Sequence, residues 1–325
     1  MSEAQSSTAS GAQSAVQVPS GLHSNQLSLA LETVGDRWIL LIMRDAFTGV
    51  KLFDEFHRRT GAPRSTLASR LDALVAEGIL YRNPYCHSPL RHEYRITGKG
   101  LELYAFALAA WAWEMDWSKR DDLPPRVQHL ACGNEMHPKV LCAECGGEVH
   151  LEDCSFSSKA IHAGKSHLSR HYQRRSRRSV KSAASNKSFF QTADVVGDRW
   201  TSLIVSAAMF GVSNFDGFIE SLGIATNILS DRLTVLSDHD VLVRRALKDQ
   251  PSRSEYFLTE KGKGLFPGLM LLAQWGDKWM FRDISEHLEV RHESCGAPLK
   301  CQVVCDVCTQ PVDHRHVNFL LDPRT

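Results

Sequence analysis

The sequence lacks the features that would mark a secreted, membrane-bound or catalytic protein. Its first 20 residues have no basic start followed by an apolar run, which argues against a signal peptide and predicts a disordered tail at residues 1–21. The longest uncharged apolar runs, such as residues 103–113, are too short to cross a bilayer. A glycine-rich phosphate loop and a nucleophile motif are also missing. We therefore expect a cytoplasmic protein that is not an enzyme and has no membrane partner.

Acidic residues are missing from one long segment. Residues 159–187 carry nine basic residues, no acid, much serine and little apolar periodicity, which predicts a linker. It is either a solvated spacer or an arm that binds DNA phosphates and releases their counterions. The second interpretation is favoured by the cluster Arg174, Arg175, Arg177 and Arg178.

The pentapeptide VGDRW occurs twice, at residues 34–38 and 196–200. The offset that places Gly35 on Gly197 also aligns EYRIT with EYFLT and, further on, two pairs of tryptophans. An offset longer by a single position, which places Cys132 on Cys295, then aligns a set of histidines and cysteines. Because this register persists far from the first match, the chain is predicted to contain two copies of a unit of about 135 residues.

Each copy has the pattern of a winged helix. Asp36 and Asp198 are predicted N-caps, and helices at residues 53–59 and 64–77 are joined by a tight turn. A predicted hairpin follows, with strands at residues 79–83 and 92–97, or 241–246 and 255–259 in the second copy. A long helix ends each unit, at residues 98–117 and 261–281.

The long helix is apolar nearly all round, so it needs a second packing partner. The simplest partner is the same helix of the other copy, which would make the chain an intramolecular pseudo-dimer. A homodimer of two chains remains an additional possibility.

In order along the chain, we expect a tail (1–21), winged helix-turn-helix domain 1 (22–120), a zinc-ribbon-like segment (121–158), a basic linker (159–187), domain 2 (188–282) and a second ribbon-like segment (283–325). The fold class is mainly α with small β wings.

The first copy contains a series of motifs in a fixed order: VGDRW, FDEF, the Ser-Arg-Leu helix, EGIL, a proline-rich loop with Arg91, EYRIT and GKG. In this order they resemble the HxlR family of bacterial winged helix-turn-helix regulators. The resemblance implies a transcription factor that binds double-stranded DNA, associated with the nucleoid, as a two-fold dimer through its C-terminal helices. The cysteine of the family's redox members is replaced here by Asn25 and Lys187, which argues against a thiol switch at that place.

The candidates for DNA contact lie at the start of each second helix and on each wing. In the first copy they are Arg64, Ser65, Thr66, Ser69, Arg70, Arg82 and Arg91. In the second copy they are Thr226, Asn227, Ser230, Arg232, Arg244, Arg245 and Arg253.

Arg64 is the best candidate for a bidentate contact to guanine. Ser65 is alternatively only a helix cap, and Arg70 only an ion-pair partner. In the second copy Thr226 replaces Arg64 and Asp231 replaces Ser69, while Asn227 suits adenine. The two copies are therefore expected to prefer unlike half-sites, or the second binds weakly and serves for dimerisation.

Six of the nine cysteines fall into one pattern used twice, His-x2-Cys-x9-Cys-x2-Cys. The first set is His129, Cys132, Cys142 and Cys145, and the second is His292, Cys295, Cys305 and Cys308. Each set is predicted to hold one structural Zn²⁺, two per chain, because four such ligands close a tetrahedral site. The alternatives are reduced cysteines without metal, or disulfides, which a cytosolic compartment disfavours. The histidine is the weakest assignment, because His137, His150 and Cys154, or Cys301, His314 and His316, can also complete a site.

Two classes of function compete. The first is a DNA-binding transcriptional regulator, with a small-molecule effector as a further possible partner. The second is a protein-interaction scaffold built on winged helices with structural zinc and without sequence-specific DNA binding. The basic linker and the arginines of the wings favour the first.

Overall fold

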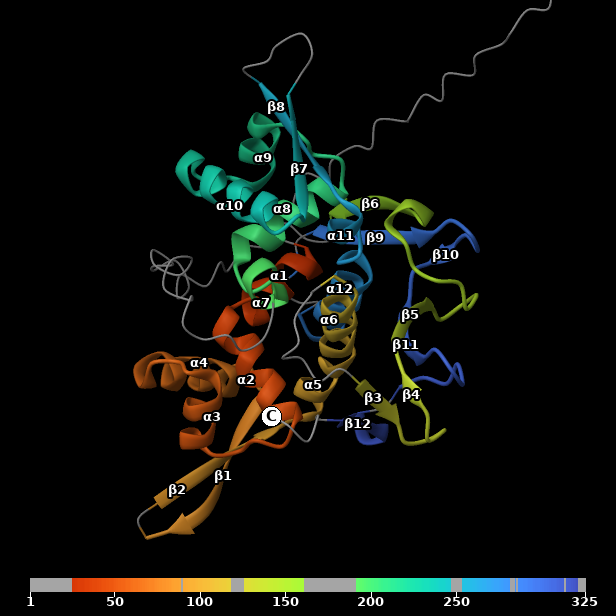
Figure 1. Cartoon of the computed structure of the whole chain (residues 1–325). Coiled ribbons are helices and arrows are strands. Elements are labelled where there is room, and N and C mark those ends of the chain that lie inside the picture. The colour runs from red at the N-terminus through yellow and green to blue at the C-terminus, as the bar shows by residue number, and fades with distance from the viewer. Residues whose placement is uncertain are drawn as a thin grey trace, which may run out of the picture.

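The structure is a computed structural model that describes residues 25–88, 90–117, 126–160, 191–246, 253–280, 284, 286–312 and 314–320. The predicted tail and residues 161–187 of the predicted linker, including Arg174, Arg175, Arg177 and Arg178, lie outside these residues. Two helical units stand at opposite ends of the molecule, and their hairpins extend in opposite directions (Figure 1). Within the described residues, no helix combines the length and apolarity needed to span a membrane.

The two units have the same order of elements. The first contains α1 (Gln26–Val34), α2 (Arg37–Phe47), α3 (Phe53–Thr60), α4 (Arg64–Ala76), β1 (Leu80–His87), β2 (Leu90–Ile96), α5 (Gly98–Leu101) and α6 (Tyr104–Trp117). The second contains α7 (Gln191–Val195), α8 (Arg199–Met209), α9 (Phe215–Leu222), α10 (Thr226–Asp238), β7 (Leu242–Ala246), β8 (Ser254–Leu258), α11 (Glu260–Lys263) and α12 (Phe266–Met280).

The predicted N-caps of VGDRW are confirmed in both units. The side chain of Asp36 accepts hydrogen bonds from the backbone N–H groups of Trp38 and Ile39 at the start of α2. Asp198 does the same for Trp200 and Thr201 at the start of α8. A carboxylate here satisfies free amides and matches the positive end of the helix dipole.

Helix α4 packs through one apolar stripe. Leu67, Leu71 and Leu74 are each no more than 1% exposed, and they lie three or four residues apart. They join a core that also holds Phe56 of α3, which is fully buried. The opposite face of α4 is left to the solvent.

The C-terminal helix of each unit is broken in two, where one continuous helix was predicted. The hydroxyl oxygen of Thr97 caps a short first helix, α5, by accepting from the N–H of Gly100. A Cβ atom on Gly100 would overlap the carbonyl oxygen of Ile79, so this turn packs directly on the start of the wing. The long helix α6 begins only at Tyr104.

The two units pack on each other through equivalent residues. The indole N–H of Trp113 donates to the carbonyl oxygen of Lys261 at 2.8 Å, and that of Trp275 donates to the carbonyl oxygen of Lys99 at 2.9 Å. Each lysine ammonium also lies over the opposite tryptophan ring, at 5.5 and 5.4 Å from the centroid. The sequence offset between the copies exchanges these two contacts, as a pseudo-two-fold axis would.

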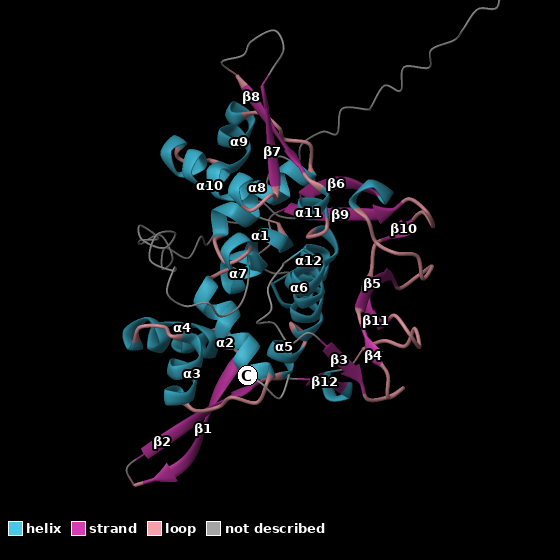
Figure 2. Cartoon of the chain, viewed as in Figure 1, coloured by secondary structure: helices cyan, strands magenta, loops and turns pink. Residues whose placement is uncertain are grey.

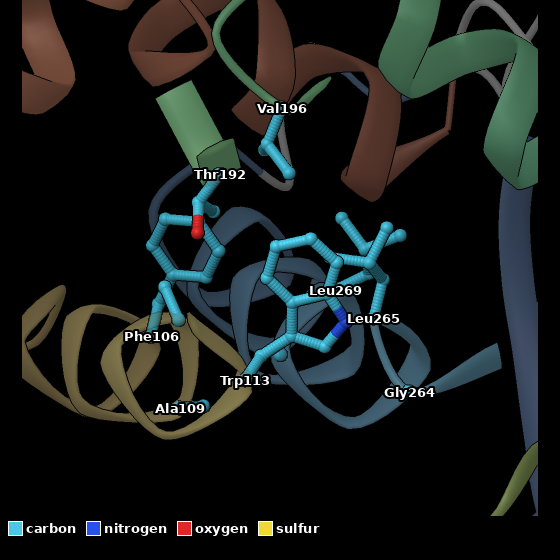
Figure 3. A pocket seen from close by; sticks show the side chains of 10 residues that line it. Phe106, Ala109, Trp113, Thr192, Val196, Gly264, Leu265 and Leu269 are labelled. Atoms are coloured by element: carbon cyan, nitrogen blue, oxygen red, sulfur yellow. The ribbon is translucent and has the colours of Figure 1, made fainter. Parts of the chain in front are cut away.

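A small cavity lies within this contact, lined by apolar side chains of α6 and α12 and by Thr192 and Val196 (Figure 3). Its volume of about 10 Å³ is about that of one water-sized probe. It has no room for an effector.

Strands outside the wings line one side of the helices (Figure 2). They are β3 (Arg126–His129), β4 (Glu135–Met136), β5 (Pro138–Cys142), β6 (Cys154–Ala160), β9 (Glu286–His292), β10 (Ala297–Pro298), β11 (Cys301–Cys305) and β12 (Val317–Leu320), with 3-10 turns at Leu151–Asp153 and His314–His316. Their sheets have the orders β10-β9-β6, β11-β5 and β12-β3-β4. Every one of these sheets therefore pairs strands of both copies, where two separate ribbon-like segments were predicted.

Candidate nucleic-acid interface and metal centres

The outer face of α4 carries the predicted recognition residues. Arg64, Ser65 and Ser69 are exposed and Thr66 is half-buried. The N-cap position belongs to Pro63, so Ser65 lies inside the first turn and is not the cap. α4 and α10 lie on the side of the helical centre that faces away from the shared strands (Figure 1).

The Arg64 side chain is exposed and contacts Asp54 and Phe53 of α3. Its guanidinium lies 2.9 Å from a carboxylate oxygen of Asp54 and 5.0 Å from the ring centroid of Phe53. The side chains of Arg64 and Asp54 are 62% and 81% exposed. Because exposed ion pairs are weak, this arginine can turn toward another acceptor at little cost.

Arg70 does not share the exposed position of Arg64. Its guanidinium contacts Asp36, the N-cap of α2, at 2.8 Å, and both side chains are 26% exposed. In the second copy Arg232 makes two hydrogen bonds of 2.9 Å to Asp198. Arg70 and Arg232 therefore each form an ion pair with a carboxylate inside their own helix-turn-helix, as the alternative interpretation of Arg70 expected.

The wing arginines differ in their surroundings. Arg82 forms an ion pair with Asp72 of α4, and Arg91 is exposed near the tip of the first hairpin. Arg244 donates to the hydroxyl of Ser254 at 2.8 Å, and the Arg245 guanidinium lies 5.0 Å from the Phe257 ring centroid. Arg253 is exposed beside residues 247–252, which lie outside the described part of the chain.

The start of α10 is more acidic than that of α4. Thr226, Asn227 and Ser230 lie on it, together with Asp231, and all four are exposed. The two recognition faces therefore present different hydrogen-bonding groups, and only the first begins with an arginine.

The eight predicted metal ligands do assemble into two groups of four, but the groups cross the copies. One group is His129, Cys132, Cys305 and Cys308, and the other is Cys142, Cys145, His292 and Cys295. Within each group all ligand atoms lie within 4.8 Å of one another. The predicted partition into one set per copy is therefore wrong, although each ligand pair stays intact.

Strand geometry explains the exchange. The two ligand pairs of the first copy are separated by β5, and its residues from Pro138 to Cys142 span roughly 13 Å in extended conformation. Antiparallel pairing with β11 sets Cys301 opposite Cys142, and Cys305 opposite Pro138. Each end of this two-stranded sheet therefore brings together ligand pairs from different copies.

The four ligand pairs share one turn. The residue after the second ligand of each pair has a left-handed backbone, with φ of 76° at Gly133, 73° at Gly146, 68° at Gly296 and 58° at Thr309. The N–H of this residue donates to the carbonyl oxygen of the first ligand in every pair, at 2.7 to 2.9 Å. Glycine suits this conformation, and the turn directs both ligand atoms of a pair to one point.

Distances between ligand atoms fit a tetrahedral Zn²⁺. The Nδ1 atom of His129 lies 3.5 Å from the sulfur of Cys132 and 3.3 Å from that of Cys308, and the Cys132 and Cys305 sulfurs are 4.0 Å apart. With Zn–S near 2.3 Å and Zn–N near 2.0 Å, a tetrahedron requires roughly 3.5 Å and 3.8 Å. In the other group His292 Nδ1 lies 3.4 Å from the sulfur of Cys145 and 3.5 Å from that of Cys295.

The pKa shifts of the cysteines differ from one thiol to another: those of Cys132 and Cys142 are lowered, and those of Cys145 and Cys305 are raised. A hydrogen bond from the backbone N–H of Asn134 is the main cause that lowers the pKa of Cys132 to about 6, which favours the thiolate that metals bind. Burial raises the pKa of Cys154 to about 12, and it raises that of Cys301 further. Cys154 and Cys301, two of the alternative ligands, are in neither group.

Comparison with known proteins finds the same family twice in this chain. The model of the family described as HxlR-like helix-turn-helix matches residues 33–122 and 195–284. The HTH-type transcriptional regulator Rv3095 of Mycobacterium tuberculosis is 44% identical over 121 residues, which are 37% of this chain and 77% of that protein. The HTH-type transcriptional regulator YvaP of Bacillus subtilis is 33% identical over 93 residues, or 28% of this chain and 86% of that protein. The solved structure of PA1607 is 36% identical and covers 40% of this chain and 91% of its own, with a TM-score of 0.37.

Proposed function

We propose that this chain, which belongs to the HxlR-like helix-turn-helix family, is a cytoplasmic DNA-binding transcriptional regulator whose two copies act as an intramolecular pseudo-dimer. The observation that carries the proposal is the placement of α4 and α10. Their polar outer faces are exposed on one side of the molecule, away from the shared strands (Figure 1). One chain thereby offers two recognition helices to the same duplex.

The operator is asymmetric in this proposal, because the recognition faces differ. Arg64 reads guanine, with Ser65, Thr66 and Ser69 beside it. In the second half-site Asn227 reads adenine, flanked by Thr226 and Ser230, while the Asp231 carboxylate disfavours phosphate and accepts from cytosine. The half-sites lie about 10 base pairs apart, or a multiple of that.

The remaining arginines hold the position of the chain on DNA. DNA phosphates are contacted by the arginines of the basic linker and by those of the wings, which are Arg82, Arg91, Arg244, Arg245 and Arg253. Arg70 and Arg232 are positioning residues, because their ion pairs with Asp36 and Asp198 fix each recognition helix to the helix-turn-helix core.

Each crossed ligand group holds one structural Zn²⁺. Three thiolates and one imidazole fill the coordination sphere and leave no open position for chemistry, so the metal supplies only a cross-link. Because each ion would take two ligands from each copy, the two sites join the copies to each other. This keeps α4 and α10 at a fixed spacing.

The test is DNA binding by the full chain. A preferred duplex of about 40 base pairs, long enough for two half-sites, is selected from a random pool, and affinities are measured by fluorescence anisotropy at several salt concentrations. Arg64→Ala is expected to weaken binding by roughly 5- to 150-fold, the worth of one bidentate base contact, and to relax the preference at one position. Thr226→Ala tests the second half-site in the same way.

Arg126→Ala is the matched control. Arg126 is also an exposed arginine in an ion pair of 2.9 Å, with Glu135, but it lies on a shared strand. It is expected to change affinity less than about twofold, because it is far from both recognition helices. If Arg64→Ala and Thr226→Ala both behave like this control, the assignment of base-reading residues is wrong. If the wild type selects no sequence and its weak binding does not depend on salt, the chain is instead a protein-interaction scaffold.

A further inference from the structure

A second, larger cavity lies where the first copy meets the shared strands of the second. Its walls come from α5 and α6, from α12, from β11 and from Pro311, Val312 and His314. Its volume is about 500 Å³, which is typical of small-molecule sites. Both copies contribute walls, so an occupant would lie across the joint between them.

The floor of this cavity is apolar. Tyr104 and Leu271 are 7% exposed and Val303 is 4% exposed, and all three line it. The Tyr104 ring is held edge-on by Phe47, at a centroid distance of 5.1 Å. This floor suits a flat hydrocarbon or aromatic group.

The rim of the cavity is polar and includes the ammonium of Lys278 and the carboxylate of Glu102. The Lys278 ammonium contacts one carboxylate oxygen of Glu102 at 2.7 Å, and the indole N–H of Trp279 donates to the other at 3.0 Å. Both oxygens of Glu102 therefore already have a donor. Lys278 has three N–H groups, is 61% exposed, and uses one of them in this pair. An anionic group is the complement of what Lys278 still offers.

The equivalent place in the other copy is built differently. The sequence offset between the copies replaces Tyr104 by Phe266 and Lys278 by Asp116. There Phe156 packs edge-on against Phe266, with centroids 5.8 Å apart. Its counterpart Phe319 instead packs on Trp111, and the Tyr104 ring is met edge-on by His314, at a centroid distance of 6.1 Å, beside the cavity that both residues line. The duplicated scaffold by itself therefore does not explain the cavity or its basic rim.

We propose that this cavity binds a small aromatic anion, with its ring on the floor of Tyr104, Leu271 and Val303 and its anionic group at Lys278. The ring gains by apolar burial, and the anion gains a charge-assisted hydrogen bond. Binding of this kind does not depend on DNA, so it can fail while the proposed function holds, and the reverse is also true.

The test uses 2-naphthoate as the probe and neutral 2-naphthamide as its uncharged partner, titrated by calorimetry into the full zinc-loaded chain without DNA. Naphthoate is expected to bind once per chain, at least about tenfold more tightly than the amide. Lys278→Met is expected to remove most of this difference. Ala105→Phe, which fills the cavity from its α6 wall, is expected to abolish binding of both molecules.

Lys263→Met is the matched control, because Lys263 also forms ion pairs with glutamates, Glu152 and Glu260, but does not line the cavity. It is expected to leave both affinities unchanged. The proposal is overturned by equal binding of naphthoate and naphthamide, by naphthoate binding that survives both Lys278→Met and Ala105→Phe, or by no saturable binding up to about 1 mM. Lys278 is a surface residue, so its variant reports on the site even if the filled variant does not fold.

Discussion

Two double substitutions test the crossed metal centres. Cys132→Ser with Cys308→Ser removes two thiolates from one group and leaves the other group complete. Cys132→Ser with Cys145→Ser removes one thiolate from each group. Each variant loses two cysteines from two different turns, so the two are matched in chemistry and differ only in how the loss is divided.

The expected size follows from the number of ligands that remain. Structural zinc sites bind with about 10–16 kcal/mol in small domains, so each of four ligands is worth roughly 3 kcal/mol, or about 100-fold in affinity. The Cys132/Cys308 variant should therefore keep one ion at full affinity and lose the other. The Cys132/Cys145 variant should hold both ions about 100-fold more weakly.

Native mass spectrometry and competition with a chromogenic chelator measure this directly. We expect two chelator-resistant Zn²⁺ per chain in the wild type, one in the Cys132/Cys308 variant and none in the Cys132/Cys145 variant. Each full site lost should also lower the free energy of unfolding, by about 2.7 kcal/mol when free zinc is about 100 times the dissociation constant. The reverse order of the two variants would mean that the ligands are grouped within each copy, and the absence of zinc from the wild type would refute both centres.

Two further predictions concern stability. A Cβ atom on Gly276 of α12 would overlap the carbonyl oxygen of Gln26 in α1, so Gly276→Ala should lower the free energy of unfolding by about 1–3 kcal/mol. Gly268 lies in the same helix, and an added Cβ there has its nearest neighbour at 3.7 Å. Gly268→Ala should therefore raise the free energy of unfolding by up to about 1 kcal/mol, and urea titrations measure both variants. A hydrogen bond to Asp116 raises the pKa of His137 above its usual 6.5, so the pair stabilises the fold below pH 6.5 and loses that contribution as pH rises through the raised value. Both side chains of the pair are substantially exposed, so the change in the free energy of unfolding should stay below about 1 kcal/mol. At saturating zinc, the difference in stability between pH 6 and pH 8 should be smaller in His137→Gln than in the wild type. An unchanged difference would contradict a stabilising role of the His137–Asp116 pair.

Local features of the fold could be predicted from the sequence because they depend on neighbouring residues. The caps at Asp36 and Asp198 follow from a carboxylate placed before an apolar run, and the buried stripe of α4 follows from leucines spaced three and four apart. The break between α5 and α6 was missed. At this break Gly100 of α5 lies against Ile79, just before β1, a contact between segments that are apart in the sequence.

The candidate sites divide in the same way. The types of metal ligand and their pairing two by two could be predicted, because a His-x2-Cys or Cys-x2-Cys turn fixes two ligand atoms locally. Arg70 could not be assigned from its helical position alone, because its carboxylate partner is 34 residues away. A strand at residues 138–142 would have argued against binding of both ligand pairs of a copy to the same ion, because an extended segment of that length holds the two pairs apart.

By itself the sequence determined the duplication, the helix-turn-helix of each copy, the divergence between Arg64 and Thr226, and the identity of the eight ligands. Only the tertiary structure decided which ligands meet, which arginines face outward, and where a cavity remains. The physical reason is that pairing between β5 and β11 joins segments that lie in different copies, and its register depends on how the two copies pack rather than on any spacing within one of them.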